Sequence, residues 1–305
     1  MNAPPGSRAH LVERAVAAMS GRASAPPETL APSPSPPPPP PTGSGPDPRP
    51  RPSQPPLPEI SLETLAAAGL VVAPVGTIRS RLSEEIAVVQ HSVLRTVKAT
   101  RATDGRCPRL VLVTSARPGE GKTFVSLNLA ASLANSGTKP VLLIDVDGKQ
   151  GSISQLLGQE NTPGLRMLAA DPTRQAATML VPTAVKRLSF LSFGPLPKGM
   201  TGLPPGQLVM AALLRLAAAL PEHLIILDTP PCLSTSDPGA LAPIAGQVLM
   251  VVEAERTQRS EVEAALDMVD SCPTLQLVLN RAVLTANDTF GAYGGYGAYG
   301  AYSDR

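Results

Sequence analysis

The stretch RLVLVTSARPGEGKT (109–123) constrains the fold of this chain more than any other feature. Its first half is apolar and is typical of a buried strand, and a helical pattern follows it directly. Small residues in its second half let backbone N–H groups curl around a phosphate, while Lys122 can reach phosphate oxygens and Thr123 can offer a hydroxyl to Mg²⁺. The stretch therefore predicts a phosphate-binding loop between a strand and a helix, with Ala116 at a first position that is more often glycine.

Short apolar runs alternate with helical patterns along most of the chain. Strands are predicted at 109–115, 140–145, 188–194, 223–228, 247–253 and 275–280, and helices at 61–70, 82–100, 123–136, 208–220 and 260–269. Because the strands lack polar alternation, they should be covered on both faces. We therefore predict an α/β fold, a mostly parallel, P-loop NTPase-like sheet with helices on both faces.

The distribution of proline sets the N-terminal limit of the folded part. Of the 36 prolines, 19 fall within the first 58 residues, where few apolar residues can offset the entropy cost of ordering. We expect residues 1–59 to be disordered and Pro-rich, apart from a short helix at about 8–20, and residues 60–286 to form one P-loop domain. Residues 287–305 should form a flexible tail, since Gly-rich chains behave as random coils. This tail holds every tyrosine of the chain: Tyr293, Tyr296, Tyr299 and Tyr302.

Charge and cysteine content exclude several classes of protein. A formal net charge of +2 gives no reason to expect nucleic acid or anionic lipid as a partner. Cys107, Cys232 and Cys272 are odd in number and share no ligand spacing, so we interpret them as buried or incidental thiols. No secretory signal opens the chain, and no apolar run reaches about 18 residues. We therefore expect a cytoplasmic protein whose association with a membrane depends on a partner.

Three aspartates stand where predicted strands end. Asp145 and Asp147 close the strand at 140–145, and Asp228 closes the strand at 223–228. Since the carboxyl ends of parallel strands meet at one edge of the sheet, all three should lie beside the phosphate-binding loop. Carboxylates at that place suit Mg²⁺ binding and phosphoryl transfer. Each aspartate alone could cap a helix, Asp147 above all, but the three together predict a catalytic site.

In their motifs, these segments resemble the bacterial protein-tyrosine kinases (BY-kinases) of exopolysaccharide and capsule assembly, particularly the free-standing cytoplasmic autokinases. The similarity runs from about residue 60 to the end. It rests on PGEGKT (118–123), LLIDVD (142–147), IILDTPP (225–231) and the Tyr-rich C-terminus, with weaker likeness in ISLETLAAAGL (60–70) and SEE (83–85).

This resemblance implies a protein-tyrosine autokinase that uses ATP and Mg²⁺. Its catalytic residues would be Lys122, Asp145, Asp147 and Asp228, and its metal ligands Thr123, Asp145 and Asp228. Which aspartate activates the tyrosine hydroxyl stays open. The residues expected to bind the nucleotide are Pro118, Gly119, Glu120, Gly121, Lys122, Thr123, Phe124 and Asn280. Asn280 can equally be a polar strand end, and the ring of Phe124 is expected in the core.

The tail is the expected substrate of this kinase. Its flexibility lets it reach a neighbouring subunit's nucleotide site or its own, and we expect autophosphorylation in trans at Tyr293, Tyr296, Tyr299 and Tyr302. Four phosphotyrosines would add about −6 to −8 charges, enough to act as an assembly switch. The resemblance also implies a homo-oligomer and a cognate tyrosine phosphatase. It further implies activation by the cytoplasmic segment of a membrane-embedded polysaccharide chain-length regulator (co-polymerase), which would hold the protein at the inner membrane.

Two other functions fit the same fold. A partitioning or positioning ATPase would carry a lysine at Arg117 and a glycine at Pro118, so this loop is closer to that of the kinases. A non-catalytic, nucleotide-gated scaffold for a polysaccharide-export membrane protein is the second alternative, and the tail would then be an adhesive segment. Two departures from the kinase pattern bear on this choice. Lys149 replaces an arginine common among relatives, and segment 84–96 lacks an early arginine used in ring assembly.

Overall fold

The computed structural model describes residues 57–72, 80–101, 105–137, 139–197 and 206–283. The predicted helix at about 8–20, almost all of the Pro-rich region and the tail with its four tyrosines lie outside these residues. The limits of the P-loop domain, placed at residues 60 and 286, therefore stay predictions.

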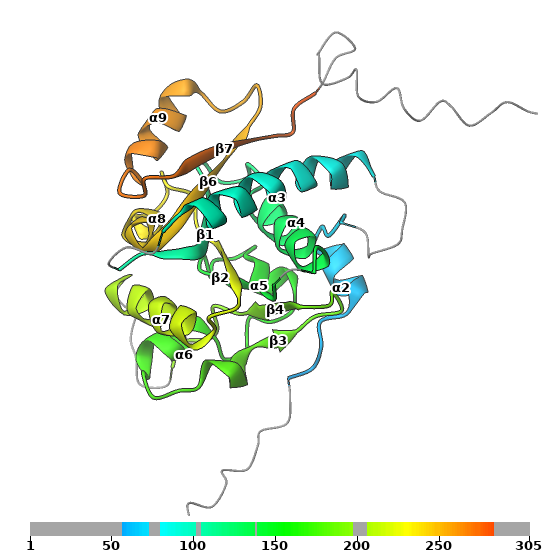
Figure 1. The fold of residues 1–305 in the computed structure, drawn as a ribbon, viewed down its shortest axis with the longest axis vertical. Helices are drawn as coiled ribbons and strands as arrows, with labels where there is room; N and C mark the ends of the chain where they lie inside the picture. The colour runs from blue at the N-terminus through cyan, green and yellow to red at the C-terminus, as the bar shows by residue number, and fades with distance from the viewer. Residues whose placement is uncertain (1–56, 73–79, 102–104, 138, 198–205, 284–305) are drawn as a thin grey trace, which may run out of the picture. The chain divides into compact units, whose positions relative to one another are not determined.

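The described residues build a seven-stranded sheet with the strand order β3-β4-β2-β5-β1-β6-β7 (Figure 1). Its strands are β1 (Cys107–Ser115), β2 (Val141–Asp145), β3 (Val181–Pro182), β4 (Leu188–Leu191), β5 (Leu224–Asp228), β6 (Ala245–Glu253) and β7 (Leu275–Asn280). All neighbouring pairs are parallel except β3 with β4. The predicted α/β fold with a mostly parallel sheet is confirmed.

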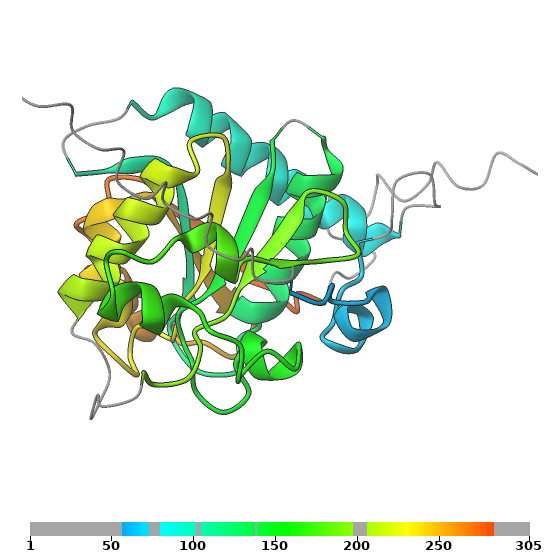
Figure 2. The same ribbon diagram turned by 90° about the horizontal axis from the view of Figure 1, so that it is seen from below.

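Helices cover both faces of this sheet (Figures 1 and 2). They are α2 (Leu62–Ala67), α3 (Arg81–Ala99), α4 (Lys122–Asn135), α5 (Ile153–Leu156), α6 (Leu165–Ala170), α7 (Gly206–Ala219), α8 (Asp237–Leu241) and α9 (Arg259–Asp267), with 3₁₀ turns η1 (Ala176–Met179) and η2 (Ala242–Ile244). Helices α3 and α4 pack on one face, and α6 to α9 on the other. Within the described part of the chain, none of these helices has both the length and the apolarity to cross a membrane.

The central strand β1 shows why two layers of helices form. Leu110 and Leu112 face one layer, while Val111 and Val113 face the other, because successive side chains of a strand point to opposite faces. All four side chains are fully buried. An uninterrupted apolar strand of this kind needs cover on both sides, as the sequence predicts.

Predicted element bounds agree with the structure to within a few residues, with one informative difference. The strand predicted at 188–194 ends at Leu191. After it, the carbonyl oxygens of Ser192 and Phe193 accept hydrogen bonds from the backbone of Leu165 and Arg166, which joins the end of β4 to α6 instead of extending the sheet. The short elements β3, α5, α6 and α8 hold too few residues for a periodic pattern, and the sequence does not predict them.

The side chain of Asn128 on α4 fixes the segment that follows α2. Its Oδ1 accepts hydrogen bonds from the backbone N–H groups of Val71 (2.8 Å) and Val72 (3.2 Å). Its Nδ2 donates to the carbonyl oxygens of Gly69 and Phe124, at 2.9 Å each. Because α4 begins at the phosphate-binding loop, this segment is attached directly to the helix that carries the site.

Candidate active site

The phosphate-binding loop and two of the predicted aspartates lie at one edge of the sheet. Strand β5 lies between β1 and β2, so the carboxyl ends of the three strands are adjacent. In register, Asp228 lies beside Val113 of β1 and beside Asp145 of β2. The loop connects the end of β1 to the start of α4 at the same edge. The structure thus brings together the groups that the sequence places at separate strand ends.

Two glycines give the loop its shape. Gly119 and Gly121 have φ angles of 88° and 94°, a backbone region that favours glycine. At Gly121 a Cβ atom would also lie 2.2 Å from Nδ2 of Asn280, closer than real contacts allow. Pro118 and Gly119 are exposed, so this side of the loop is open to a ligand.

Glu120 holds the loop against the rest of the domain. Its side chain is buried, with 2% of its surface exposed. One carboxylate oxygen accepts a hydrogen bond from the backbone N–H of Arg117 at 2.6 Å, and the other accepts one from the hydroxyl of Thr257. The carbonyl oxygen of Glu120 accepts a further hydrogen bond from Asn280, at 2.8 Å. The predicted contacts of Glu120 and Asn280 with nucleotide therefore stay predictions, while their observed role is to brace the loop.

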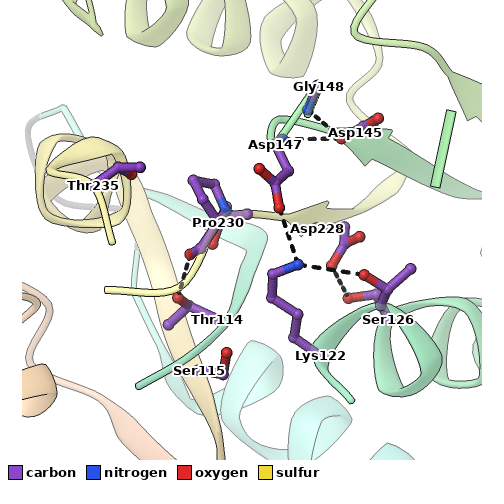
Figure 3. Close-up of polar contacts among 12 residues, drawn as sticks. Thr114, Ser115, Lys122, Ser126, Asp145, Asp147, Gly148, Asp228, Pro230 and Thr235 are labelled. Atoms are coloured by element: carbon purple, nitrogen blue, oxygen red, sulfur yellow. Dashed lines mark hydrogen bonds and ion pairs between the residues drawn. The ribbon is translucent and has the colours of Figure 1, made fainter. Parts of the chain in front are cut away.

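Lys122 pairs with an aspartate of the second motif. Its Nζ lies 3.1 Å from Oδ2 of Asp147 (Figure 3). The same atom lies 3.4 Å from the hydroxyl of Thr123. Burial works to lower the pKa of Lys122, but the charges of Asp228 and Asp147 outweigh it, and the pKa is raised. The lysine is thus held as an ammonium ion at the place where phosphates would bind.

The side chain of Asp145 accepts hydrogen bonds from the backbone that follows it. Its Oδ1 accepts hydrogen bonds from the N–H groups of Asp147 (2.9 Å) and Gly148 (3.2 Å), and its Oδ2 accepts one from Ser154 (3.1 Å). The carboxylate is fully buried. These bonds fix the turn that carries Asp147, whose Oδ1 is buried without a hydrogen-bond partner among the described residues.

Asp228 is fully buried, and its pKa is raised. Burial raises its pKa to about 7 against the lowering effect of Lys122, and the nearby charge of Asp145 adds to the rise. Its Oδ1 accepts a hydrogen bond from Ser126 on α4 at 3.1 Å. Its Oδ2 is buried and has no partner within the described residues. This oxygen is therefore a candidate metal ligand.

These groups fit a magnesium ion bound together with a nucleotide. The described residues hold no cluster of three or more His, Cys, Asp or Glu side chains of the kind that cages a metal. Mg²⁺ does not need one, because it is usually held by one or two carboxylates together with phosphate oxygens and waters. The unpartnered oxygen of Asp228, with the hydroxyl of Thr123, offers that partial set.

Some residues that shape the site have no signal in the sequence motifs. Ser126 could have been considered, because it is a polar residue one turn after Thr123 on the helix that follows the loop. Ser154 and Thr257 could not, since each reaches the site only through the fold. The predicted Phe124 and Asn280 line, with Gly121, a cavity of about 830 Å³ between α3 and β7, next to the loop.

Comparison with known proteins identifies relatives of much of this chain. A family model described as "ParA: NUBPL iron-transfer P-loop NTPase" matches residues 106–295. The tyrosine-protein kinase wzc of Salmonella typhimurium is 34% identical over 164 residues, which are 53% of this chain and 22% of that protein. The tyrosine-protein kinase YwqD of Bacillus subtilis is 29% identical over 208 residues, 67% of this chain and 85% of that protein. The match to EpsB of Ralstonia nicotianae covers 20% of that protein, so the chain spans about a fifth of the length of several relatives.

Two solved kinase domains have a similar fold. The kinase domain of the Escherichia coli tyrosine kinase ETK aligns with a TM-score of 0.56 over 70% of this chain and 84% of that chain, at 23% identity. At this identity the likeness concerns the fold alone. The VpsO kinase domain aligns with a TM-score of 0.53 over 73% of this chain and 97% of that chain, at 26% identity.

Proposed function

Because the chain belongs to the ParA family of P-loop NTPases, we propose that it uses its nucleotide site as an ATP-dependent protein-tyrosine autokinase in exopolysaccharide or capsule biosynthesis. The observation that carries this proposal is the pairing of Lys122 with Asp147 beside the buried acid Asp228. Relatives named tyrosine-protein kinases support the choice of reaction.

The loop and Lys122 would bind the phosphates of ATP. Backbone N–H groups at the start of α4 and the ammonium group suit phosphate oxygens. When Lys122 turns to a phosphate, it gives up its contact with Asp147 and leaves that carboxylate with two free oxygens. Asp145 keeps the turn in place throughout, because its oxygens are occupied by backbone N–H groups.

Asp147 is then the group best placed to receive the proton of the tyrosine. In the transfer, the tyrosine oxygen forms a bond to the γ-phosphorus, the bond from that phosphorus to ADP breaks, and the phenolic proton passes to the carboxylate. Thr123 and Asp228 would hold Mg²⁺. The hydroxyl of Ser126, which donates a hydrogen bond to Asp228, would fix the position of that carboxyl group. When bound, Mg²⁺ neutralises the charge on the phosphate oxygens.

The adenine end of the nucleotide would bind next to the loop. The cavity lined by Gly121, Phe124 and Asn280 begins at the loop and has an apolar wall from α3 and β7. An aromatic base in such a cavity would be excluded from water on one side. The phosphates and the base would therefore lie on the two sides of Gly121.

We propose as substrate the four tyrosines of the tail, phosphorylated in trans within a homo-oligomer. The activating partner would be the cytoplasmic segment of a membrane-embedded polysaccharide chain-length regulator, and a cognate tyrosine phosphatase would reverse the reaction. This arrangement places a cytoplasmic protein at the periphery of the inner membrane. The names of the relatives support the kinase activity, and several of these proteins carry the matched domain within a much longer chain.

The test is mass spectrometry of tail peptides from the full chain after expression, comparing wild type with Lys122→Ala. Phosphotyrosine in the wild type and none in the variant is the expected result. Co-expression with the cytoplasmic segment of the chain-length regulator supplies the activator. Unphosphorylated tails in its presence, or equal phosphorylation in both proteins, would contradict the proposal.

A partitioning-type switch ATPase is the second candidate, because Arg117 occupies the place of a lysine that acts across a dimer in those proteins. Here its guanidinium pairs with Glu261 of the same chain, with Nη1 and Oε1 3.2 Å apart. This contact favours a role within one subunit. ATP hydrolysis that is stimulated by DNA or lipid, without phosphorylation of tyrosine, would favour the switch ATPase over the kinase.

A further inference from the structure

A basic side chain lies at the active edge of the sheet, on the side of the aspartates away from the phosphate-binding loop. Arg166 is the second residue of α6, and its Cζ lies 4.3 Å above the ring centre of Phe193. Its Nη1 donates a hydrogen bond to the carbonyl oxygen of Gly194 at 3.2 Å. Phe193 follows β4, and β4 is the neighbour of β2 opposite to β5. The guanidinium group is therefore beside the end of the strand that carries Asp145.

The ring under Arg166 is fixed relative to the catalytic turn. The backbone N–H of Phe193 donates to the hydroxyl of Ser154 at 3.2 Å, and the N–H of Ser154 donates to Asp145 at 3.1 Å. Gly148 packs closely against the same ring, since a Cβ atom at this position would be only 1.7 Å from Cδ1 of Phe193. Arg166 is thus held on a platform that is attached to the aspartate turn by hydrogen bonds and by direct packing.

This guanidinium group has a donor without an acceptor. Its Nε is buried and has no hydrogen-bond partner among the described residues, and the same residues give it no ion pair. Burial lowers the pKa of Arg166, and the charge of Asp145 partly offsets this effect, so the group stays charged. A planar guanidinium stacked on an aromatic ring suits a phosphate group, whose oxygens accept hydrogen bonds from such a cation.

We propose that Arg166 binds the phosphate group of a phosphotyrosine in the tail of a neighbouring copy of this chain, next to the place where another tyrosine of that tail is phosphorylated. This inference rests on the proposed kinase function. The phosphates of ATP belong to the loop and Lys122 on the other side of the aspartates, so the phosphate offered to Arg166 is the one already transferred. The tail tyrosines recur every third residue, about 10 Å apart in an extended chain.

The consequence is a tail that is phosphorylated faster after its first phosphate than before it. A singly phosphorylated tail is held at Arg166 while a second tyrosine reaches the active site. Each later phosphorylation then starts from a bound substrate, so multiply phosphorylated tails form early. Without Arg166 each phosphorylation starts from a free tail, and singly phosphorylated chains accumulate first.

Binding is measured with the full chain after phosphatase treatment and with saturating ADP and Mg²⁺, so that the phosphate-binding loop is filled. The probe is a peptide of residues 287–305, either unphosphorylated or phosphorylated at Tyr299. Wild type should prefer the phosphorylated peptide, and Arg166→Gln should bind it about tenfold more weakly or worse, since hydrogen bonds to charged groups are lost. The control is Arg174→Gln, which removes an exposed arginine paired with Asp171 and should leave the affinity within about twofold.

A second variant and a second readout keep the test decisive. Arg166→Lys keeps the charge without the planar fork, so it should bind the phosphopeptide with intermediate affinity. ADP binding by each variant reports that the domain is folded. Intact-mass spectra during incubation with ATP should show multiply phosphorylated chains early in wild type and singly phosphorylated chains in Arg166→Gln.

The outcomes separate this inference from the proposed function. Equal phosphopeptide affinities of wild type, Arg166→Gln and Arg166→Lys would overturn the inference and leave the kinase function intact. Phosphopeptide binding that depends on Arg166, in a chain that never labels its tail, would instead overturn the kinase function and leave an anion-binding site. If wild type prefers the phosphorylated peptide and Arg166→Gln accumulates singly phosphorylated chains early, both the inference and the proposed kinase function are supported.

Discussion

The Nζ atom of Lys122 lies 3.1 Å from Oδ2 of Asp147, and the two side chains expose only 14% and 10% of their surface. This contact joins the phosphate-binding loop to the turn after β2. Since an ion pair at this depth is poorly solvated, removing one partner leaves a charge that water cannot compensate well. The two motifs are therefore coupled before any nucleotide binds.

A double-mutant cycle on this pair should show strong coupling. We expect the effects of Lys122→Met and Asp147→Asn on the free energy of unfolding to be non-additive by about 1–3 kcal/mol, because either substitution alone leaves a buried charge unpaired. The measurement is urea denaturation of the nucleotide-free protein.

The matched control for this cycle is the exposed pair of Lys139 and Glu222. Their charged atoms lie 3.9 Å apart, with 43% and 77% of the side-chain surface exposed. We expect the cycle of Lys139→Met and Glu222→Gln to give a coupling of about 0.5 kcal/mol or less. A coupling at Lys122 and Asp147 no larger than this would show that the buried contact does not connect the two motifs.

Asp228 should make the protein less stable as the pH rises from about 4 to about 7. Its pKa is about 7 in the folded protein, whereas that of an ordinary aspartate is near 4. Between these values the folded state holds the proton and the unfolded state has lost it, so each rise in pH favours unfolding. Asp228→Asn cannot lose a proton, and the stability of this variant relative to wild type should therefore grow across this range by on the order of a few kcal/mol.

Denaturation of wild type and Asp228→Asn at several pH values measures this difference directly. Other groups titrate in both proteins and cancel in the comparison, so the difference isolates Asp228. Above about pH 8 the difference should be constant. A difference that shrinks from pH 4 to pH 7 would mean that the folded protein favours the ionised carboxylate.

Glu120 should support nucleotide binding without touching the nucleotide through its carboxylate. In Glu120→Ala the N–H of Arg117 and the hydroxyl of Thr257 lose their buried acceptor, which should cost about 2–4 kcal/mol of stability. The loosened loop should bind a fluorescent ATP analogue about tenfold more weakly. Thr257→Val removes only one of these bonds and should reduce both quantities less. Unchanged nucleotide affinity in Glu120→Ala would show that the loop keeps its shape without this brace.

The sequence predicts the strands that carry the site but not the contacts that complete it. Apolar runs that end in Asp145 and Asp228 are visible in a single sequence, because burial on both faces removes polar residues from the strands. Glu120 looks like a nucleotide contact in its motif, and only the fold reveals a partner 137 positions away. The platform of Arg166 on Phe193 is equally invisible, since it depends on how the turn after β4 meets a short helix.

The buried amide of Asn128 should attach the segment after α2 to the phosphate-binding helix. Asn128→Ala leaves two backbone N–H groups and two carbonyl oxygens without their partner, and we expect a loss of about 2–4 kcal/mol in the free energy of unfolding. Hydrogen exchange should rise at Val71 and Val72, whose N–H groups bind its Oδ1. Asn128→Asp keeps that acceptor, so it should protect these two amides better than the alanine variant.

Asn161→Ala, at an exposed asparagine, is the control and should change stability by less than about 0.5 kcal/mol. Equal exchange at Val71 and Val72 in wild type and Asn128→Ala would mean that packing alone holds the segment to α4.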